Sequence, residues 1–275
     1  MKAVVIGLGL IGGSLALNLM KNKFISSVYG VDNNEAHAKK ALELNLVHEM
    51  IDFKDINKCD LIFLCVPVGA IINIIKELKD IPKTTTIIEF GSTKLSILNS
   101  VPNELKEQFI LAHPMAGTEH NGPTAAKIDL FKNAVCVLCD TDKTSVFHQH
   151  RTIELLSNIG MRITFMNSVA HDHHSAIISH LPHVISFSLA NYVLECEDKK
   201  NILHLAGGSF GDMSRIAKSS PAMWSSVFKE NKENVLSALN GFVNELNEFK
   251  QMLEAQDYDK LNEWLKNANK LKEIL

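Results

Sequence analysis

The feature that most constrains this chain is a glycine-rich turn placed directly between an apolar strand and a helical segment. Residues 2–6 (Lys-Ala-Val-Val-Ile) have the character of a buried strand, and the pattern Gly-x-Gly-x-x-Gly follows at residues 7–12. Gly7 permits a tight turn, Gly9 lets a ligand approach the backbone, and Gly12 lets helix and strand pack closely. This order of elements predicts the first unit of a Rossmann-type sheet.

An acidic residue at the end of the second predicted strand indicates which ligand the turn would hold. Residues 28–31 form that strand, and Asp32 follows twenty residues after Gly12. A helix N-terminus suits a pyrophosphate, and a carboxylate at Asp32 can accept the ribose hydroxyls of an adenosine while repelling a 2′-phosphate. We therefore predict NAD rather than NADP as the cofactor. The expected contacts are Gly7, Gly9, Leu10, Ile11, Gly12 and Asp32, with Val66 and Pro67 lining the same crevice.

Segments with strand character alternate with helical patterns in the first part of the chain and then stop. Alternating strands and helices are typical of a mostly parallel sheet with helices on both faces. After residue 165 apolar residues recur every three or four positions, and Asp257 is a plausible N-cap for the last such run. We therefore expect a Rossmann-type α/β domain over residues 1–165 and an all-α domain over residues 166–275. The predicted strands lie at residues 2–6, 28–31, 61–65, 86–90, 109–112, 134–139 and 162–165.

Composition and charge narrow the class of protein. Hydrophobic residues make up 46% of the chain, enough for a core, and a formal net charge of −3 gives no basic field for nucleic acid or a membrane surface. Residues 3–20 and 175–194 contain no Asp, Glu, Lys or Arg, so both satisfy a hydropathy criterion for a membrane span. Glycines interrupt the first stretch and Pro182 the second, so we expect both to be buried elements of a cytoplasmic protein.

The five cysteines do not suggest a disulfide framework. Cys136 and Cys139 form a Cys-x-x-Cys pattern, but their odd spacing on a strand sends the two thiols to opposite faces. We therefore expect buried, inert thiols and no metal site. The helical part carries more apolar positions than one packing seam needs, which predicts a homodimer.

Two loops follow predicted strands at the edge where α/β enzymes place catalytic groups. Gly-Ser-Thr-Lys at residues 91–94 contains Ser92, and His113 begins the segment His-Pro-Met-Ala-Gly-Thr-Glu at residues 113–119. An imidazole with a pKa near 6.5 can accept a hydroxyl proton at neutral pH. A structural histidine is the alternative interpretation of His113.

The helical part contributes further histidines and one arginine. His-Asp-His-His at residues 171–174 is typical of a solvated helix start and shows no matched spacing for a metal. His180 and His183 share a helix face, and Pro182 between them predicts a break in the helix. A glycine-rich loop at residues 206–211 leads to Arg215, whose guanidinium suits a carboxylate, with a surface ion pair as the alternative.

Taken together, these motifs resemble those of the prephenate dehydrogenase family, which also includes arogenate and cyclohexadienyl dehydrogenases. The resemblance spans nearly the whole chain. It implies a modified Rossmann domain followed by an α-helical dimerisation domain. It also implies NAD-dependent oxidative decarboxylation of prephenate to 4-hydroxyphenylpyruvate, on the route to tyrosine. The motifs lie at residues 7–14, 91–94, 113–119, 179–183 and 207–217.

The same resemblance implies roles for individual residues. His113 would bond the ring hydroxyl of the substrate and assist hydride transfer, Ser92 would orient both, and Arg215 would bind a substrate carboxylate. Glu89 stands where such proteins usually carry Asp. The length leaves no room for a fused chorismate mutase or ACT domain, so we expect feedback by tyrosine to act at the active site or to be absent. The remaining pocket residues would be His180, His183, Thr118, Glu119 and Trp224.

Three alternatives remain open at this point. Arogenate could replace prephenate, because the two differ only in an amino or keto group on the side chain. A β-hydroxyacid-type dehydrogenase shares the layout of domains but predicts a catalytic lysine on the helical part, and no comparable motif is present. A non-enzymatic NAD-binding sensor would not need His113, Ser92 and Arg215 together.

Overall fold

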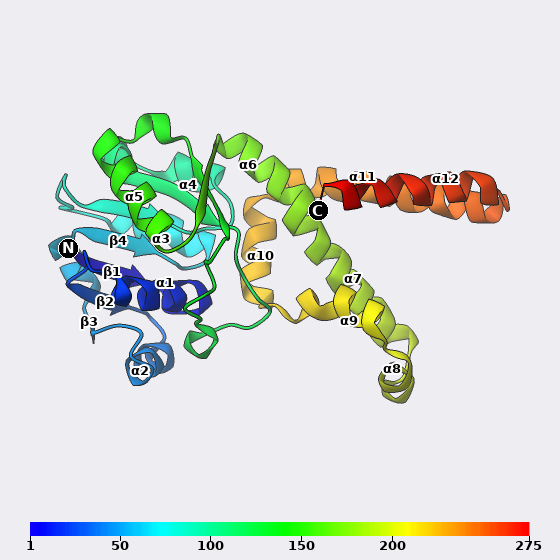
Figure 1. The fold of residues 1–275 in the computed structure, drawn as a ribbon, viewed down its shortest axis with the longest axis horizontal. Helices are drawn as coiled ribbons and strands as arrows, with labels where there is room; N and C mark the ends of the chain where they lie inside the picture. Colours follow the sequence, from blue (N-terminus) through cyan, green and yellow to red (C-terminus); the bar gives the residue numbers. More distant parts are fainter. Residues whose placement is uncertain (275) are drawn as a thin grey trace. The chain divides into compact units, whose positions relative to one another are not determined.

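The computed structural model describes residues 1–274 and contains one eight-stranded sheet (Figure 1). The strand order is β3-β2-β1-β4-β5-β6-β7-β8, and every neighbouring pair is parallel except β6 and β7. The predicted Rossmann-type sheet is therefore confirmed. The prediction missed β3, which is too short to show a pattern. The strands are β1 (Lys2–Ile6), β2 (Ser27–Val31), β3 (Glu49–Met50), β4 (Leu61–Leu64), β5 (Thr86–Glu89), β6 (Phe109–Pro114), β7 (Val135–Cys139) and β8 (Arg162–Met166).

Helices cover both faces of the sheet and bury two hydrophobic clusters against it. Leu15 and Leu155 pack in the first cluster, and Ile71 and Ile97 in the second. Cys136 belongs to the first cluster and Cys139 to the second, so the two thiols point to opposite faces as predicted. Burial raises the pKa of each thiol to about 12. The first face carries α1 (Leu10–Lys21), α2 (Glu35–Glu43) and α5 (Val146–Asn158), and the second carries α3 (Val68–Glu77) and α4 (Leu95–Ser100).

After β8, the described part of the chain contains helices and no further strand. Residues up to Asn231 form one compact unit, and the residues from Lys232 onward form a second. The side chain of Asp257 accepts the backbone N–H of Lys260 at 3.0 Å, which confirms the predicted N-cap. The domain boundary at residue 165 stays a prediction. The helices are α6 (Ser168–Ser175), α7 (Leu181–Cys196), α8 (Lys199–Leu205), α9 (Gly208–Arg215), α10 (Pro221–Glu230), α11 (Lys232–Glu254) and α12 (Tyr258–Asn269).

Helices α6 and α7 are joined by a π-helical turn at Ala176–His180, so residues 168–196 run as one helix. Pro182 lacks the N–H that would continue the normal i→i−4 ladder, and the widened turn immediately precedes it. The predicted break is therefore present as a π-helical turn within a continuous helix, and the helix does not end there. It carries His180 into the interior.

The prediction that residues 175–194 are buried was wrong. The helix Ser168–Cys196 is long and apolar enough to cross a membrane by length and composition, and only 11% of its most apolar window is buried. Ile178 is 73% exposed and Leu194 is 70% exposed. Residues 3–20, in contrast, form most of β1 and α1, and the majority of them are buried, as predicted. An exposed apolar helix of this kind requires another surface to cover it.

Candidate active site

The glycine turn has the geometry that a dinucleotide requires. Gly7 adopts a φ of +89°, and a Cβ at Gly12 would lie 1.8 Å from the carbonyl oxygen of Gly7. A Cβ at Gly9 would meet nothing within 4 Å, so the space beside that backbone is open. Helix α1 begins at Leu10 without a side chain capping its first N–H groups, which leaves donors for an anion. These residues fit the pyrophosphate of NAD.

Asp32 is held beside this turn at the end of β2. Its Oδ2 accepts the backbone N–H of Leu8 at 2.8 Å, and its Oδ1 accepts that of Asn34 at 2.9 Å. The side chain is only 7% exposed. Because each carboxylate oxygen has further lone-pair capacity, Asp32 is fixed in place and can still accept hydroxyl groups.

The residues after β4 complete the wall of the turn. A Cβ at Gly7 would lie 2.5 Å from the side chain of Val66, so Val66 packs directly against the turn. Pro67 follows as the exposed N-cap residue of α3. Both therefore lie at the carboxyl edge of the sheet, where the sequence placed them.

A buried ion pair shapes the loop after β5. The side chains of Glu89 and Lys94 are both fully buried and contact each other through Oε1 and Nζ. Glu89 also accepts the N–H of Gly91 at 2.7 Å, and Lys94 donates to the carbonyl of Ala112 at 2.7 Å. Burial raises the pKa of Glu89 to about 6, although Lys94 opposes this shift. The pair closes the loop that contains Ser92 and fixes it to the residue before His113.

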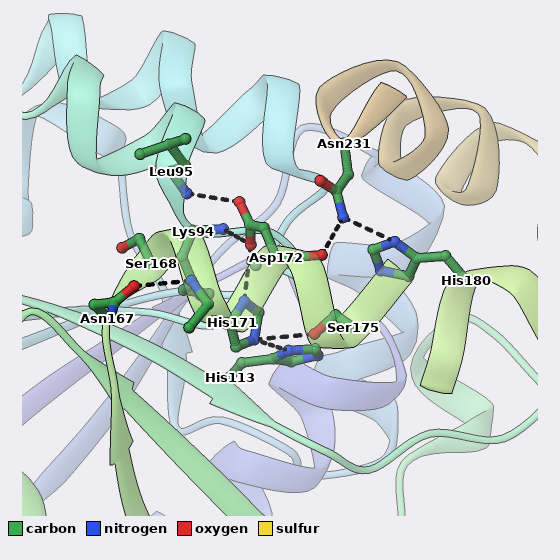
Figure 2. A network of polar contacts seen from close by, with 12 residues as sticks. Lys94, Leu95, His113, Asn167, Ser168, His171, Asp172, Ser175, His180 and Asn231 are labelled. Atoms are coloured by element: carbon green, nitrogen blue, oxygen red, sulfur yellow. Dashed lines mark hydrogen bonds and ion pairs between the residues drawn. The ribbon is translucent and has the colours of Figure 1, made fainter. Parts of the chain in front are cut away.

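His113 ends a chain of polar contacts that reaches into α6 (Figure 2). Its Nδ1 lies 2.8 Å from Nε2 of His171, and Nδ1 of His171 lies 2.8 Å from Oδ1 of Asp172. The carboxylate of Asp172 also accepts the backbone N–H groups of Lys94 at 2.8 Å and Leu95 at 2.9 Å. One acidic side chain therefore joins α6, the loop after β5 and the end of β6.

The surroundings of His113 favour its neutral form. Burial lowers its pKa well below the usual value, and the positive charge of Lys94 acts in the same direction. Repulsion from the protonated forms of His171 and His180 acts in the same direction. At neutral pH His113 is therefore an uncharged imidazole that can accept a proton.

The helical residues form an aromatic wall near this chain. His180 is 1% exposed, and its Nδ1 lies 3.2 Å from Nδ2 of Asn231, which also donates to the carbonyl of Asp172 at 2.7 Å. The ring of His183 stacks on Trp224 with centroids 3.6 Å apart. Within residues 1–274, the buried atoms Nε2 of His180 and Nε1 of Trp224 have no hydrogen-bond partner. Buried polar atoms of this kind are candidates for contacts with a bound ligand.

Arg215 lies at the end of α9 and pairs with the loop after β6. It is 54% exposed and donates through Nη1 to Oε2 of Glu119 at 3.1 Å. The charge of Arg215 also contributes, after burial, to the lowered pKa of His183. Thr118 lies in the same loop and accepts the N–H of His120 at 3.2 Å. The predicted glycine-rich loop is helical from Gly208 onward, so a helix rather than a loop positions Arg215.

The structure brings Arg215 to Glu119 and both His180 and His183 to Trp224, while the predicted cofactor residues, Ser92 and His113 lie at or after strands at the carboxyl edge of the sheet. Ser92 is the least engaged, because its hydroxyl makes no hydrogen bond in the part of the chain that the structure describes. No group of three or more His, Cys, Asp or Glu side chains suited to a metal occurs among residues 1–274.

The sequence analysis missed His171 and Asp172. The interpretation of residues 171–174 as a solvated helix start was wrong for these two, which are each 2% exposed, although His173 and His174 are exposed. The reason is that α6 packs against α4, which buries one stripe of the helix. The buried positions 171, 172, 175 and 176 follow helical spacing, and this signal could have revealed the stripe.

Two family models match the chain in succession. The prephenate dehydrogenase nucleotide-binding domain matches residues 15–165, and the prephenate dehydrogenase dimerization domain matches residues 167–267. A prephenate dehydrogenase of Bacillus subtilis is 31% identical over 95% of this chain and 72% of its own length. A cyclohexadienyl dehydrogenase of Zymomonas mobilis is 34% identical over 97% of this chain and 93% of its own length.

Solved structures give the same result. Prephenate dehydrogenase of Aquifex aeolicus in complex with hydroxyphenyl propionate and NAD⁺ superposes with a TM-score of 0.91 at 31% identity, covering 100% of this chain and 98% of that one. Arogenate dehydrogenase of Synechocystis superposes with a TM-score of 0.77 at 29% identity, covering 99% of each chain.

Proposed function

This chain belongs to the prephenate dehydrogenase family, and we propose that it converts prephenate and NAD⁺ to 4-hydroxyphenylpyruvate, carbon dioxide and NADH. The observation that carries this proposal is the neutral His113 at the carboxyl edge of the sheet. The glycine turn that fits NAD lies at the same edge. An NAD-binding sensor would have no use for a buried proton acceptor in this position.

The reaction first requires that the protein removes the proton of the ring hydroxyl. His113 accepts this proton as the carbinol carbon becomes a carbonyl. Bound NAD⁺ supplies the acceptor for the hydride that leaves the same carbon. Ser92, in the loop after β5, orients the hydroxyl toward His113.

The rest of the substrate is held by the helical residues. Arg215 exchanges Glu119 for a substrate carboxylate, which its exposed guanidinium can bind through two N–H groups. His180, His183 and Trp224 line the pocket around the ring, and Thr118 and Glu119 border its entrance. Holding both ends of the substrate aligns the reacting carbon, which is the main demand of such a reaction.

Carbon dioxide then leaves, and the electron pair of the broken bond enters the ring. The ring becomes aromatic, and the phenolate oxygen takes back the proton that His113 holds. No net proton is released, and His113 returns to its neutral form.

The exposed apolar helix fits a dimer better than a membrane span. The matched dimerization domain includes Ser168–Cys196, whose apolar residues are mostly uncovered in a single chain. We infer a cytoplasmic homodimer in which this face packs against a second copy. Sedimentation at micromolar concentration should show a dimer, and a monomer under those conditions would contradict this inference.

Steady-state formation of NADH tests the proposed reaction. Purified protein with NAD⁺ and prephenate should produce NADH and 4-hydroxyphenylpyruvate in equal amounts. Binding of NAD⁺ without turnover of any cyclohexadienol would leave only the sensor interpretation.

Arogenate is the second candidate substrate, because the relatives include a cyclohexadienyl dehydrogenase at 34% identity and an arogenate dehydrogenase with the same fold. The same assay with arogenate decides between them. A higher kcat/KM for arogenate than for prephenate would reassign the substrate and leave the chemistry at His113 unchanged.

A further inference from the structure

We propose that His171 and Asp172 are positioning residues that fix which ring nitrogen of His113 carries the proton, a role that rests on the proposed function. The contacts determine the direction of every hydrogen bond in the chain, starting from the carboxylate (Figure 2).

Asp172 can only accept in this arrangement. Its Oδ1 receives the backbone N–H of Lys94 at 2.8 Å, and its Oδ2 receives that of Leu95 at 2.9 Å. A backbone N–H is always a donor, so both oxygens accept, as those of an ionised carboxylate do. A carboxylate has no hydrogen to donate, so with Asp172 ionised the contact of 2.8 Å to His171 requires that Nδ1 of His171 carries a hydrogen.

The hydrogen on His171 then determines the state of His113. A neutral His171 with its proton on Nδ1 has a lone pair on Nε2. The contact of 2.8 Å from this atom to His113 is satisfied only if Nδ1 of His113 donates. Nε2 of His113 is therefore the nitrogen that keeps a lone pair and can take the hydroxyl proton. With the other tautomer of His113, two lone pairs would face each other across 2.8 Å.

Asp172 also compensates the charge that forms during the reaction. When His113 accepts a proton, the buried imidazolium lies near Lys94, which disfavours it. The carboxylate of Asp172, connected through His171, is the anion that balances this charge. The same carboxylate accepts the backbone N–H of Lys94, directly after Ser92 and Thr93. It therefore fixes the position of this loop relative to His113.

A tautomer measurement on the unsubstituted protein tests the proposal without substrate. Nitrogen-15 NMR of the imidazole rings in the full chain with NAD⁺, with His113 assigned by comparison with His113→Asn, reports which nitrogen is protonated. We expect the Nδ1–H form of His113 at pH 7.5. An Nε2–H form would overturn the proposal. Because this measurement needs no turnover, it stands even if prephenate is not the substrate.

The kinetic test is Asp172→Asn, measured as a pH profile of kcat/KM. We expect kcat to fall by about 10²-fold or more, the scale of a misplaced tautomer. The acid limb of the profile should move to lower pH, because removing the anion disfavours protonated His113. A merely structural role would lower stability without moving the limb.

Asp140→Asn is the matched control, because Asp140 follows β7 and bonds the start of the same helix from outside it. Asp140 accepts the backbone N–H of Ser168 at 3.0 Å at the start of α6 and bonds no histidine. We expect this variant to keep the wild-type acid limb. The proposal fails if Asp172→Asn shows the same limb and kcat as Asp140→Asn. If Asp172→Asn does not fold, the tautomer of the unsubstituted protein decides alone.

Discussion

A histidine lies at each end of the sheet, and the two differ in what their ring nitrogens contact. Near the amino end of β5, Nδ1 of His148 bonds the hydroxyl of Thr86 at 2.8 Å, and its Nε2 bonds the carbonyl of Lys83 at 3.1 Å. At the carboxyl end of β6, His113 bonds His171 through Nδ1, and no hydrogen bond of its Nε2 occurs among residues 1–274. Burial lowers the pKa of both histidines. A shifted pKa alone therefore does not separate the two histidines. The difference is the Nε2 of His113, which makes no hydrogen bond in the described residues, and our proposal of a proton acceptor rests on it.

Substituting each of the two histidines separately should give the largest difference in kcat. His113→Asn should lower kcat by about 10²-fold or more, the usual scale for losing a general base, while binding of NAD⁺ changes little. His148→Asn should leave kcat unchanged and lower the melting temperature by a few degrees, because it breaks two buried hydrogen bonds worth about 1 kcal/mol each. Steady-state kinetics and thermal unfolding measure both. Wild-type kcat in His113→Asn would remove it from the mechanism.

Two of the three arginines, Arg215 and Arg151, extend the comparison to substrate binding. Arg215→Gln should raise KM for prephenate by roughly 10- to 100-fold, since a charged hydrogen bond contributes about 1.5–3 kcal/mol. Arg151 lies at the opposite end, where it donates to the carbonyl of Thr84 at 2.8 Å and stacks over Phe147. Arg151→Gln should therefore reduce stability without changing KM. An unchanged KM in Arg215→Gln would return that arginine to the role of a surface ion pair.

Asp32 tests the cofactor side of the functional edge. Asp32→Ser should weaken NAD⁺ binding about tenfold, because a charged acceptor for the ribose hydroxyls is lost. It should also relax the discrimination against NADP⁺, since the repulsion of a 2′-phosphate is removed. Titration with both dinucleotides gives the ratio. A ratio equal to that of the wild type would show that Asp32 serves only to brace Leu8 and Asn34.

The smallest expected effect is the pH dependence of stability, to which histidines at both ends of the sheet contribute. A histidine whose pKa is lowered on folding binds fewer protons in the folded state than in the unfolded state. Its contribution to the free energy of unfolding is therefore lost as the pH falls below the ordinary pKa near 6.5. Glu89, with its pKa raised to about 6, acts in the opposite direction and is outnumbered. The melting temperature should fall between pH 7.5 and pH 5, and a rise would contradict these assignments. The histidines with lowered pKa values are His113, His148, His171, His180 and His183.

Local signals predicted much of the fold and the functional edge. The glycine turn, the acid after β2 and the polar residues after β5 and β6 all lie at strand ends, where their neighbours in the chain fix their position. Gly7 and Gly12 show the steric roles that their spacing indicates. The two residues of β3 and the π-helical turn at Ala176–His180 have no comparable local pattern.

The supporting contacts could not be predicted because they join distant parts of the chain. His171 lies 58 residues from His113 in the sequence, and Asp172 lies 78 residues from Lys94. A buried lysine at position 94 depends on Glu89 and on the carbonyl of Ala112, which only the folded sheet brings together. The exposed face of α7 was misjudged for a related reason, because the surface that we infer to cover it belongs to a second copy of the chain.

A crystal structure of this chain with NAD⁺ and 4-hydroxyphenylpropionate would test the central claim most directly. We predict that Nε2 of His113 lies within about 2.6–3.2 Å of the ligand hydroxyl, with Arg215 released from Glu119 and bound to the ligand carboxylate. His113 and Arg215 opening into separate cavities, with no common ligand between them, would contradict it.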